Sequence, residues 1–195
     1  MEINPKYPEL LVTCGKEHLA WWKIYVEAKR IQPAAQPNYE SFLKARYVTC
    51  LRHNQRGDLI TGDSNGTVYI WGNGGNSITN FVKHGHDGSV LSVQHYRGHL
   101  LTAGRDGLFI SWTWNKNMDK DGTLQLPKSE GGVRCQLLLP VEDSTTSTLV
   151  LGTTMNSLIY VNINQAGSPL EGVTLDDVPI TQGHTGDLRA LNKIH

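Results

Sequence analysis

The 195-residue sequence has no excess of charge of either sign, because its 18 Lys and Arg residues balance its 18 Asp and Glu residues. Proteins that attract nucleic acid through their overall field carry a basic excess, so a nucleic-acid partner is not indicated. The chain also lacks an apolar run of roughly 18 residues, the length that a membrane-spanning helix requires. Residues 1–5 lack the pattern of a signal peptide. No membrane association is therefore expected.

Cysteine is scarce as well. Only Cys14, Cys50 and Cys135 occur, and no two of them form a Cys-x-x-Cys pair. An odd set of widely spaced cysteines fits neither a disulfide framework nor a zinc site, so reduced thiols in a cytosolic protein are the interpretation.

What the sequence does contain is a repeated phrase, in which a hydrophobic pair and Thr are followed by a turn and an alternating apolar run. It occurs at residues 11–22, 59–71 and 100–112, each time ending in Trp, and in weaker form at 149–161, where it ends in Val161. The end-points are 49, 41 and 49 residues apart by subtraction. A period of roughly 40–45 residues with a terminal Trp is typical of WD-type propeller blades. Such blades are binding platforms more often than enzymes.

The predicted fold is therefore all-β: a WD40-type β-propeller that is partial, with about four blades, and not closed. A single domain over 1–195 is expected, with blades at 1–37, 38–84, 85–130 and 131–182 and the start of a further blade at 183–195. The first blade is expected to lack its innermost strand.

Turn residues and alternation predict the finer structure. Asn65-Gly66 and Asp106-Gly107 predict tight hairpin turns with positive φ at both central positions, and Asn156 takes the same place in the fourth copy. Outer strands are predicted at 78–82 and 124–126. Polar surface loops are predicted at 32–39, 115–122 and 141–148. Residues 25–30 are compatible with either a helix or a strand.

The third copy carries the four residues that form a hydrogen-bonded relay in WD repeats: His86, Thr102, Asp106 and Trp112. A buried imidazole needs partners on both nitrogens and a buried indole N–H needs an acceptor, so a structural role is expected. A catalytic role fits poorly, because the hydroxyl lies in mid-strand. Residues 183–187 repeat the His opening of this blade, whereas the second blade has 44–46 in place of Gly-His, so its relay is incomplete.

Five runs, at 12–18, 57–66, 69–72, 85–90 and 151–159, together resemble the echinoderm microtubule-associated protein-like (EML) family. The resemblance follows nearly the whole chain, in order and at the family's spacing. It implies a tandem pair of propellers, of which this chain is the later part of the first. It also implies an upstream hydrophobic motif and often a basic, coiled-coil region that engages microtubules, neither of which occurs in this sequence.

A local charge asymmetry lies between residues 16 and 56, where eight basic residues stand against three acidic ones, a net charge of +5. Tubulin surfaces are acidic, so this stretch is a candidate contact, with Lys29, Arg30, Lys44 and Arg46 as the proposed tubulin-facing residues. The alternative is a solvated face without a partner.

The predicted function is that of a non-enzymatic WD-repeat binding module. By the resemblance, it binds tubulin or microtubules, influences microtubule organisation and resides in the cytoplasm at the cytoskeleton. The alternatives are an adaptor for another complex, such as a ubiquitin-ligase receptor, and an enzyme with its active site in the channel. Against an enzyme, no paired carboxylates or activated nucleophile are evident.

No cofactor or metal is expected, since the EF-hand-like stretch 117–128 has Lys128 where calcium needs Glu. Tubulin and other proteins are the expected partners.

Overall fold

The computed structural model describes residues 1–72, 74–139, 144–175 and 180–182. The regular structure in these residues is β-strand, apart from one short 3₁₀-helix, η1 (Lys128–Glu130). No helix in these ranges is long and apolar enough to span a membrane.

Within the described ranges, sixteen strands form four sheets of four strands each. The first sheet contains β1 (Glu2–Ile3), β2 (Leu10–Gly15), β3 (His18–Tyr25) and β4 (Arg30–Ala35). The second contains β5 (Val48–His53), β6 (Leu59–Asp63), β7 (Val68–Trp71) and β8 (Ile78–Val82). The third contains β9 (Val90–Tyr96), β10 (His99–Gly104), β11 (Leu108–Thr113) and β12 (Lys120–Gln125). The fourth contains β13 (Val133–Leu139), β14 (Thr146–Thr153), β15 (Ser157–Asn164) and β16 (Ile180–Gln182).

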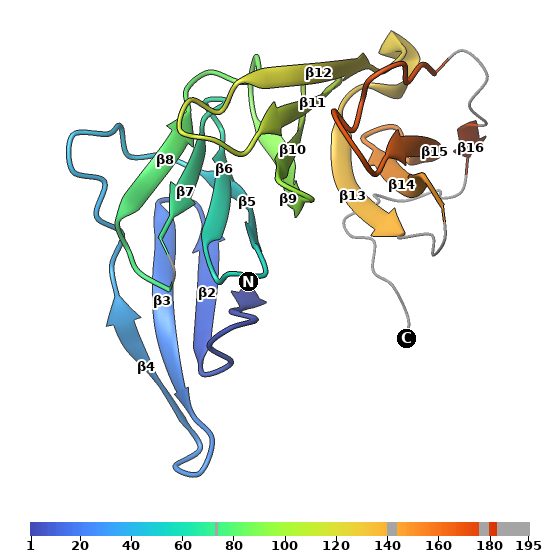
Figure 1. Cartoon of the computed structure of the whole chain (residues 1–195). Helices are drawn as coiled ribbons and strands as arrows, with labels where there is room; N and C mark the ends of the chain where they lie inside the picture. Colours follow the sequence, from blue (N-terminus) through green and yellow to red (C-terminus); the bar gives the residue numbers. More distant parts are fainter. Residues whose placement is uncertain (73, 140–143, 176–179, 183–195) are drawn as a thin grey trace.

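Each sheet is an antiparallel meander, in which every strand pairs with its neighbours in the sequence. The sheets follow one another along an open arc in chain order (Figure 1). The innermost strands β5, β9 and β13 contact one another in turn, so they line the middle of the arc. The chain is therefore an all-β, WD40-type propeller that is partial and not closed, as predicted.

The core lies between the sheets, because alternate residues of each strand point to opposite faces. On β7, Tyr69 and Trp71 pack toward the first sheet, whereas Val68 and Ile70 pack toward the third. Trp71 meets Trp21 of the first sheet edge to face, with ring centroids 5.5 Å apart. Both faces of the second and third sheets are covered in this way, which explains why β6 and β7 consist of buried residues throughout.

The prediction that the first sheet lacks its innermost strand is wrong. Residues Glu2–Ile3 form β1, which pairs with β2 in the innermost position. The strand is two residues long, so it carries no readable alternation. Nearby, Asn4 fixes the chain by donating from its side chain to the carbonyl of Gly57, 3.0 Å away in the second sheet.

All three predicted loops contain strand residues. Residues 32–35 belong to β4 despite Pro33, because β4 is an outer strand, where a missing N–H is tolerated. The strand β12 begins at Lys120, inside the stretch predicted as a loop. β14 begins at Thr146, inside the loop predicted at 141–148, of which residues 141–143 lie outside the described residues. The further blade predicted at 183–195 also lies outside them.

The hairpin turns differ from the prediction in one respect. Gly66 has φ 78° and Gly107 has φ 77°, whereas the residues before them are not in the left-handed region. The turn of the second sheet has three loop residues, closed by the Asp63 N–H donating to the Thr67 carbonyl at 3.0 Å. A three-residue loop needs positive φ only at its last position, which Gly provides. Asn156 has φ 66°, as predicted.

Candidate functional site

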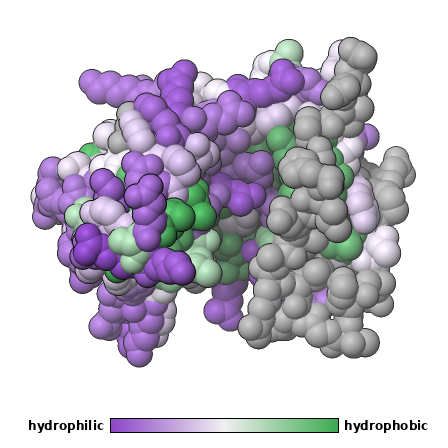
Figure 2. Space-filling view, turned by 90° about the horizontal axis from the view of Figure 1, so that it is seen from below, coloured by the Kyte–Doolittle hydropathy of each residue, from purple (hydrophilic) through white to green (hydrophobic). Residues whose placement is uncertain are grey.

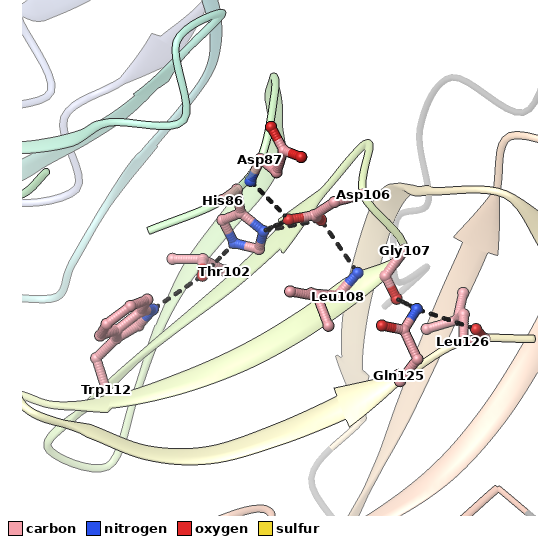
Figure 3. A network of polar contacts seen from close by, with 9 residues as sticks. All are labelled: His86, Asp87, Thr102, Asp106, Gly107, Leu108, Trp112, Gln125 and Leu126. Carbon is pink, nitrogen blue, oxygen red and sulfur yellow. Dashed lines mark hydrogen bonds and ion pairs between the residues drawn. The ribbon is translucent and has the colours of Figure 1, made fainter. Parts of the chain in front are cut away.

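The four residues of the predicted relay form one chain of hydrogen bonds in the third sheet (Figure 3). The indole N–H of Trp112 donates to Thr102 Oγ1 at 2.9 Å, and His86 Nε2 lies 2.8 Å from the same oxygen. On the other side of the ring, His86 Nδ1 lies 3.1 Å from Asp106 Oδ1. Thr102 is fully buried and His86 is 4% exposed. The relay connects the outer turn of the sheet with its interior.

The Asp106 carboxylate holds two backbone groups in addition to the imidazole. It accepts from the N–H of Asp87 at 2.9 Å and from the N–H of Leu108 at 3.1 Å. Asp106 therefore ties the segment that precedes β9 to the β10–β11 turn. A carboxylate with three donors has little capacity left for a ligand.

Burial lowers the pKa of His86, and the neighbouring Asp106 opposes this shift. The ring is therefore neutral at physiological pH. With Nδ1–H donating to Asp106, Nε2 accepts from the Thr102 hydroxyl, which in turn accepts from Trp112. The polar atoms of the relay therefore bond to one another or to backbone N–H groups, and these bonds link the segment before β9 with β10 and β11.

A glycine makes the relay possible. A Cβ atom at Gly104 would clash with His86 Nδ1 and with Asp106 Oδ1. In the second sheet the same register position is Asp63, since Val48 pairs with Asp63 as Val90 pairs with Gly104. An imidazole in the His86 position would therefore meet the Asp63 side chain there.

Of the relay, the second sheet keeps only the hydrogen bond between Trp and Thr. Trp71 donates its indole N–H to Thr61 Oγ1 at 2.9 Å. Where the third sheet has its imidazole, the segment 36–47 supplies aromatic rings instead. Tyr39 packs edge to face on Trp71 with centroids 5.2 Å apart, and Phe42 packs on Tyr69 at 6.0 Å. The sequence analysis did not predict that aromatic rings take the place of the imidazole. The signal that could have shown it is the presence of Tyr39 and Phe42 in an otherwise polar linker.

The first and fourth sheets vary the relay further. In the first sheet, Trp22 donates to Thr13 Oγ1 at 2.7 Å, and His18 Nε2 lies 2.7 Å from that oxygen. His18 comes from β3 rather than from a loop, so the Gly-His pattern does not identify it. In the fourth sheet the corresponding pair is Leu151 and Val161, both buried and apolar.

The structure places the four predicted basic residues at two separate ends of the first sheet. Lys29 and Arg30 lie at the tip of the β3–β4 hairpin. Lys44 and Arg46 lie near the opposite end of β3, where the Arg46 carbonyl accepts from the N–H of Glu17. The eight residues of β3 separate the two ends by about 23 Å. All four side chains are exposed, but they do not form one patch.

Cations at both ends are held against aromatic rings. The Arg30 guanidinium lies 4.9 Å from the centroid of the Tyr25 ring, and the Arg46 guanidinium lies 5.5 Å from that of Tyr47. Such contacts bury the stem of the side chain while its charge stays in water. The charges are available to an acidic surface.

A cavity of about 360 Å³ lies along the innermost strands, and all three cysteines line it. The thiols are free, and burial raises the pKa of Cys14 and of Cys135 and raises that of Cys50 to about 12. These thiols are poor nucleophiles at neutral pH. Across the described ranges, no group of three His, Cys, Asp or Glu side chains could hold a metal ion.

The face seen from below is hydrophilic over much of its margin, with hydrophobic residues gathered toward its middle (Figure 2).

Comparisons of the sequence with a family model and with curated proteins point to the same family. The family model described as the echinoderm microtubule-associated protein first beta-propeller matches residues 1–161. Echinoderm microtubule-associated protein-like 2 of Mus musculus is 34% identical over 191 residues, which is 97% of this chain and 26% of that protein. Echinoderm microtubule-associated protein-like 1 of Rattus norvegicus is 31% identical over 192 residues, 97% of this chain and 21% of that protein. The chain thus spans about a quarter of the length of these relatives.

An echinoderm protein and a solved structure extend the comparison. The 77 kDa echinoderm microtubule-associated protein of Lytechinus variegatus is 28% identical over 192 residues, 97% of this chain and 26% of that protein. The structure of U3-55K superposes with a TM-score of 0.70 at 15% identity and covers 95% of this chain and 52% of that chain. At that identity the likeness concerns the fold alone.

Proposed function

This chain belongs to the family of echinoderm microtubule-associated proteins, and we propose on that premise that it is a non-enzymatic WD-repeat module that binds tubulin or microtubules. The observation that carries the proposal is the match of the family's first propeller over residues 1–161. In this role the module influences microtubule organisation and resides in the cytoplasm at the cytoskeleton. Other proteins are further partners of its exposed surfaces.

The exposed cations support an acidic partner. Lys44 and Arg46 form one basic end of the first sheet, and Lys29 and Arg30 form the other. Exposed ion pairs contribute about 0.2–1 kcal/mol each and are screened over roughly 8–10 Å at physiological salt. Binding through these residues is therefore weak and strongly dependent on salt.

The experiment is co-sedimentation of the chain with microtubules over a series of salt concentrations. The double variant Lys44→Glu with Arg46→Glu is compared with Lys29→Glu with Arg30→Glu, because the structure separates the two pairs. The exposed Lys116→Glu, in the loop that follows β11, is the matched control. We expect weak binding that falls with salt, and a further reduction of about threefold to tenfold for Lys44→Glu with Arg46→Glu.

Tight binding that persists at high salt would show that charge is not the source of affinity. An absence of binding even at low salt would overturn the proposal for this segment. Comparable losses in the Lys116→Glu control would show a general charge effect instead of a local contact. Equal losses in the two double variants would place both ends of the first sheet on the partner.

A further inference from the structure

A groove of about 480 Å³ lies on the second sheet, between the segment 36–47 and the strands β7 and β8. Its main walls are formed by Phe42, Leu43, Tyr69, Phe81, Lys83 and His84. Its volume is within the range of roughly 300–1,000 Å³ that is typical of ligand sites. We call it the Leu43 groove.

The walls of the Leu43 groove are held in place by the chain itself. The Tyr69 hydroxyl donates to the carbonyl of Leu43 at 2.9 Å, which ties the segment 36–47 to β7. The Phe42 ring packs edge to face on Phe81, with centroids 4.9 Å apart. A preformed groove of this kind costs a ligand little ordering free energy.

Two large apolar side chains remain exposed at this groove. Leu43 is 72% exposed and Phe81 is 39% exposed. Phe81 belongs to β8, whereas Leu43 lies in the connecting segment, so two different parts of the chain bring apolar side chains to the groove. Covering them would remove apolar surface from water, which is favourable by about 25 cal/mol per Å².

Two lysines place positive charge at the groove. Lys83 lines it, and the exposed Lys44 follows Leu43 in the chain. Within the described part of the chain, neither Lys44 nor Lys83 takes part in an ion pair. These cations are available to a ligand.

Among the described residues, Asp63 is the only acidic one that lines the groove, and its carboxylate is already hydrogen-bonded. It is 2% exposed, and its Oδ1 accepts from the backbone N–H groups of Asn65 and Thr67. Glu40 of the segment 36–47 is exposed but does not line the groove. The groove therefore combines apolar walls with a basic rim.

We propose that the Leu43 groove binds an extended acidic peptide segment that inserts one bulky apolar side chain between Leu43 and Phe81. Acidic residues beside this side chain then lie against Lys83 and Lys44. The groove extends the module beyond its contact with tubulin, because it recognises a short linear segment of any protein with this chemistry. A methylated lysine fits less well, since Phe42 and Phe81 already touch each other and Lys83 repels a cation.

The first arm of the test varies the ligand. Fluorescence anisotropy measures binding of a fluorescein-labelled peptide of Glu residues with one central Phe to the chain. The same peptide with Ala in place of Phe is expected to bind about tenfold more weakly, the value of one buried aromatic side chain at the lower end of its range. A peptide with Lys in place of every Glu is expected to bind more weakly still. Equal binding of all three peptides, or no binding of the Glu and Phe peptide, overturns the proposal.

The second arm varies the groove. Leu43→Ser removes an exposed side chain and keeps the backbone carbonyl that Tyr69 bonds, and we expect about a fivefold loss of affinity. Its matched control is Val26→Ser, 80% exposed at the distant β3–β4 hairpin, which should bind as the parent chain does. Lys83→Glu is expected to weaken binding about threefold at low salt, against an unchanged Lys116→Glu.

Lys83→Glu also keeps the proposal testable if Leu43→Ser lowers stability, because Lys83 is exposed. Circular dichroism confirms that each variant is folded. Parent-like affinity in both Leu43→Ser and Lys83→Glu would show that the peptide binds elsewhere. Since no tubulin enters the assay, its failure leaves the proposed function untouched, and a failure of microtubule binding leaves this groove untouched.

Discussion

Replacing Asp106 with Ala is the most direct test of the relay, because this carboxylate is its outermost member. The substitution removes the acceptor of His86 Nδ1, at 3.1 Å, and of two backbone N–H groups, those of Asp87 and Leu108. Asp87 is exposed, so water replaces the lost acceptor of its N–H. The imidazole is different, since its side chain is 0% exposed.

The expected loss of stability comes mainly from the buried imidazole of His86, which water does not reach. A buried donor without an acceptor costs about 1–3 kcal/mol. The Asp106 side chain is 10% exposed, so a water molecule can reach the space that it leaves and recover part of this cost. We therefore expect Asp106→Ala to lower the free energy of unfolding by about 2 kcal/mol. Asp106→Asn keeps one acceptor oxygen and should lose less.

Urea unfolding followed by tryptophan fluorescence measures the change. With a slope of about 1–3 kcal/mol per molar urea, the midpoint should fall by roughly 1 M while the slope is unchanged. Asn65→Ala is the matched control, because Asn65 has the same turn position in the second sheet but faces no relay imidazole. It should change stability by less than about 0.5 kcal/mol. If Asp106→Ala also stays within that limit, or if Asn65→Ala costs as much, the relay does not stabilise the sheet as reasoned.

Three further predictions concern buried groups. Thr61→Val removes the acceptor of the Trp71 indole N–H and should lower the free energy of unfolding by about 1–3 kcal/mol in urea, and a negligible loss would contradict this. Burial lowers the pKa of His86 from 6.5, so the unfolded chain binds more protons below that value. The free energy of unfolding should therefore fall as the pH drops below about 6.5, and it should fall less steeply in His86→Gln. Equal decreases of the urea midpoint with pH in the two proteins would contradict this. The pKa of Cys50 is raised to about 12, so iodoacetamide at pH 8 should leave it unmodified in the folded chain but not in urea, and fast native labelling seen by mass spectrometry would oppose this.

The alternation of apolar residues was enough to predict the two strands of each repeated phrase and their order. Each phrase such as 59–71 contains two strands and the turn between them, so its signal is local. The relay was also predictable, because His86 and Asp106 occur at the spacing typical of WD repeats. The two-residue strand β1 was not, since two residues are too few to show a period.

The surroundings of Asp63 and Phe42 could not be predicted. Asp63 follows the same hydrophobic phrase as Gly104 does, and only the register shows that its side chain occupies the place of an imidazole. Phe42 lies in a linker and packs on Phe81, 39 residues later by subtraction. No short-range pattern relates these two positions.

The sequence by itself determined the class of fold, because strand period and turn residues depend on neighbours within a few residues. It indicated the family through the resemblance of five runs to that family. The tertiary structure decided where the candidate residues lie. It separated Lys29 and Arg30 from Lys44 and Arg46 along the length of β3, and it created the Leu43 groove from a linker and an outer strand. Such placements depend on which segments the packing of adjacent sheets brings together, and that is set by the burial of apolar faces over long separations in the chain.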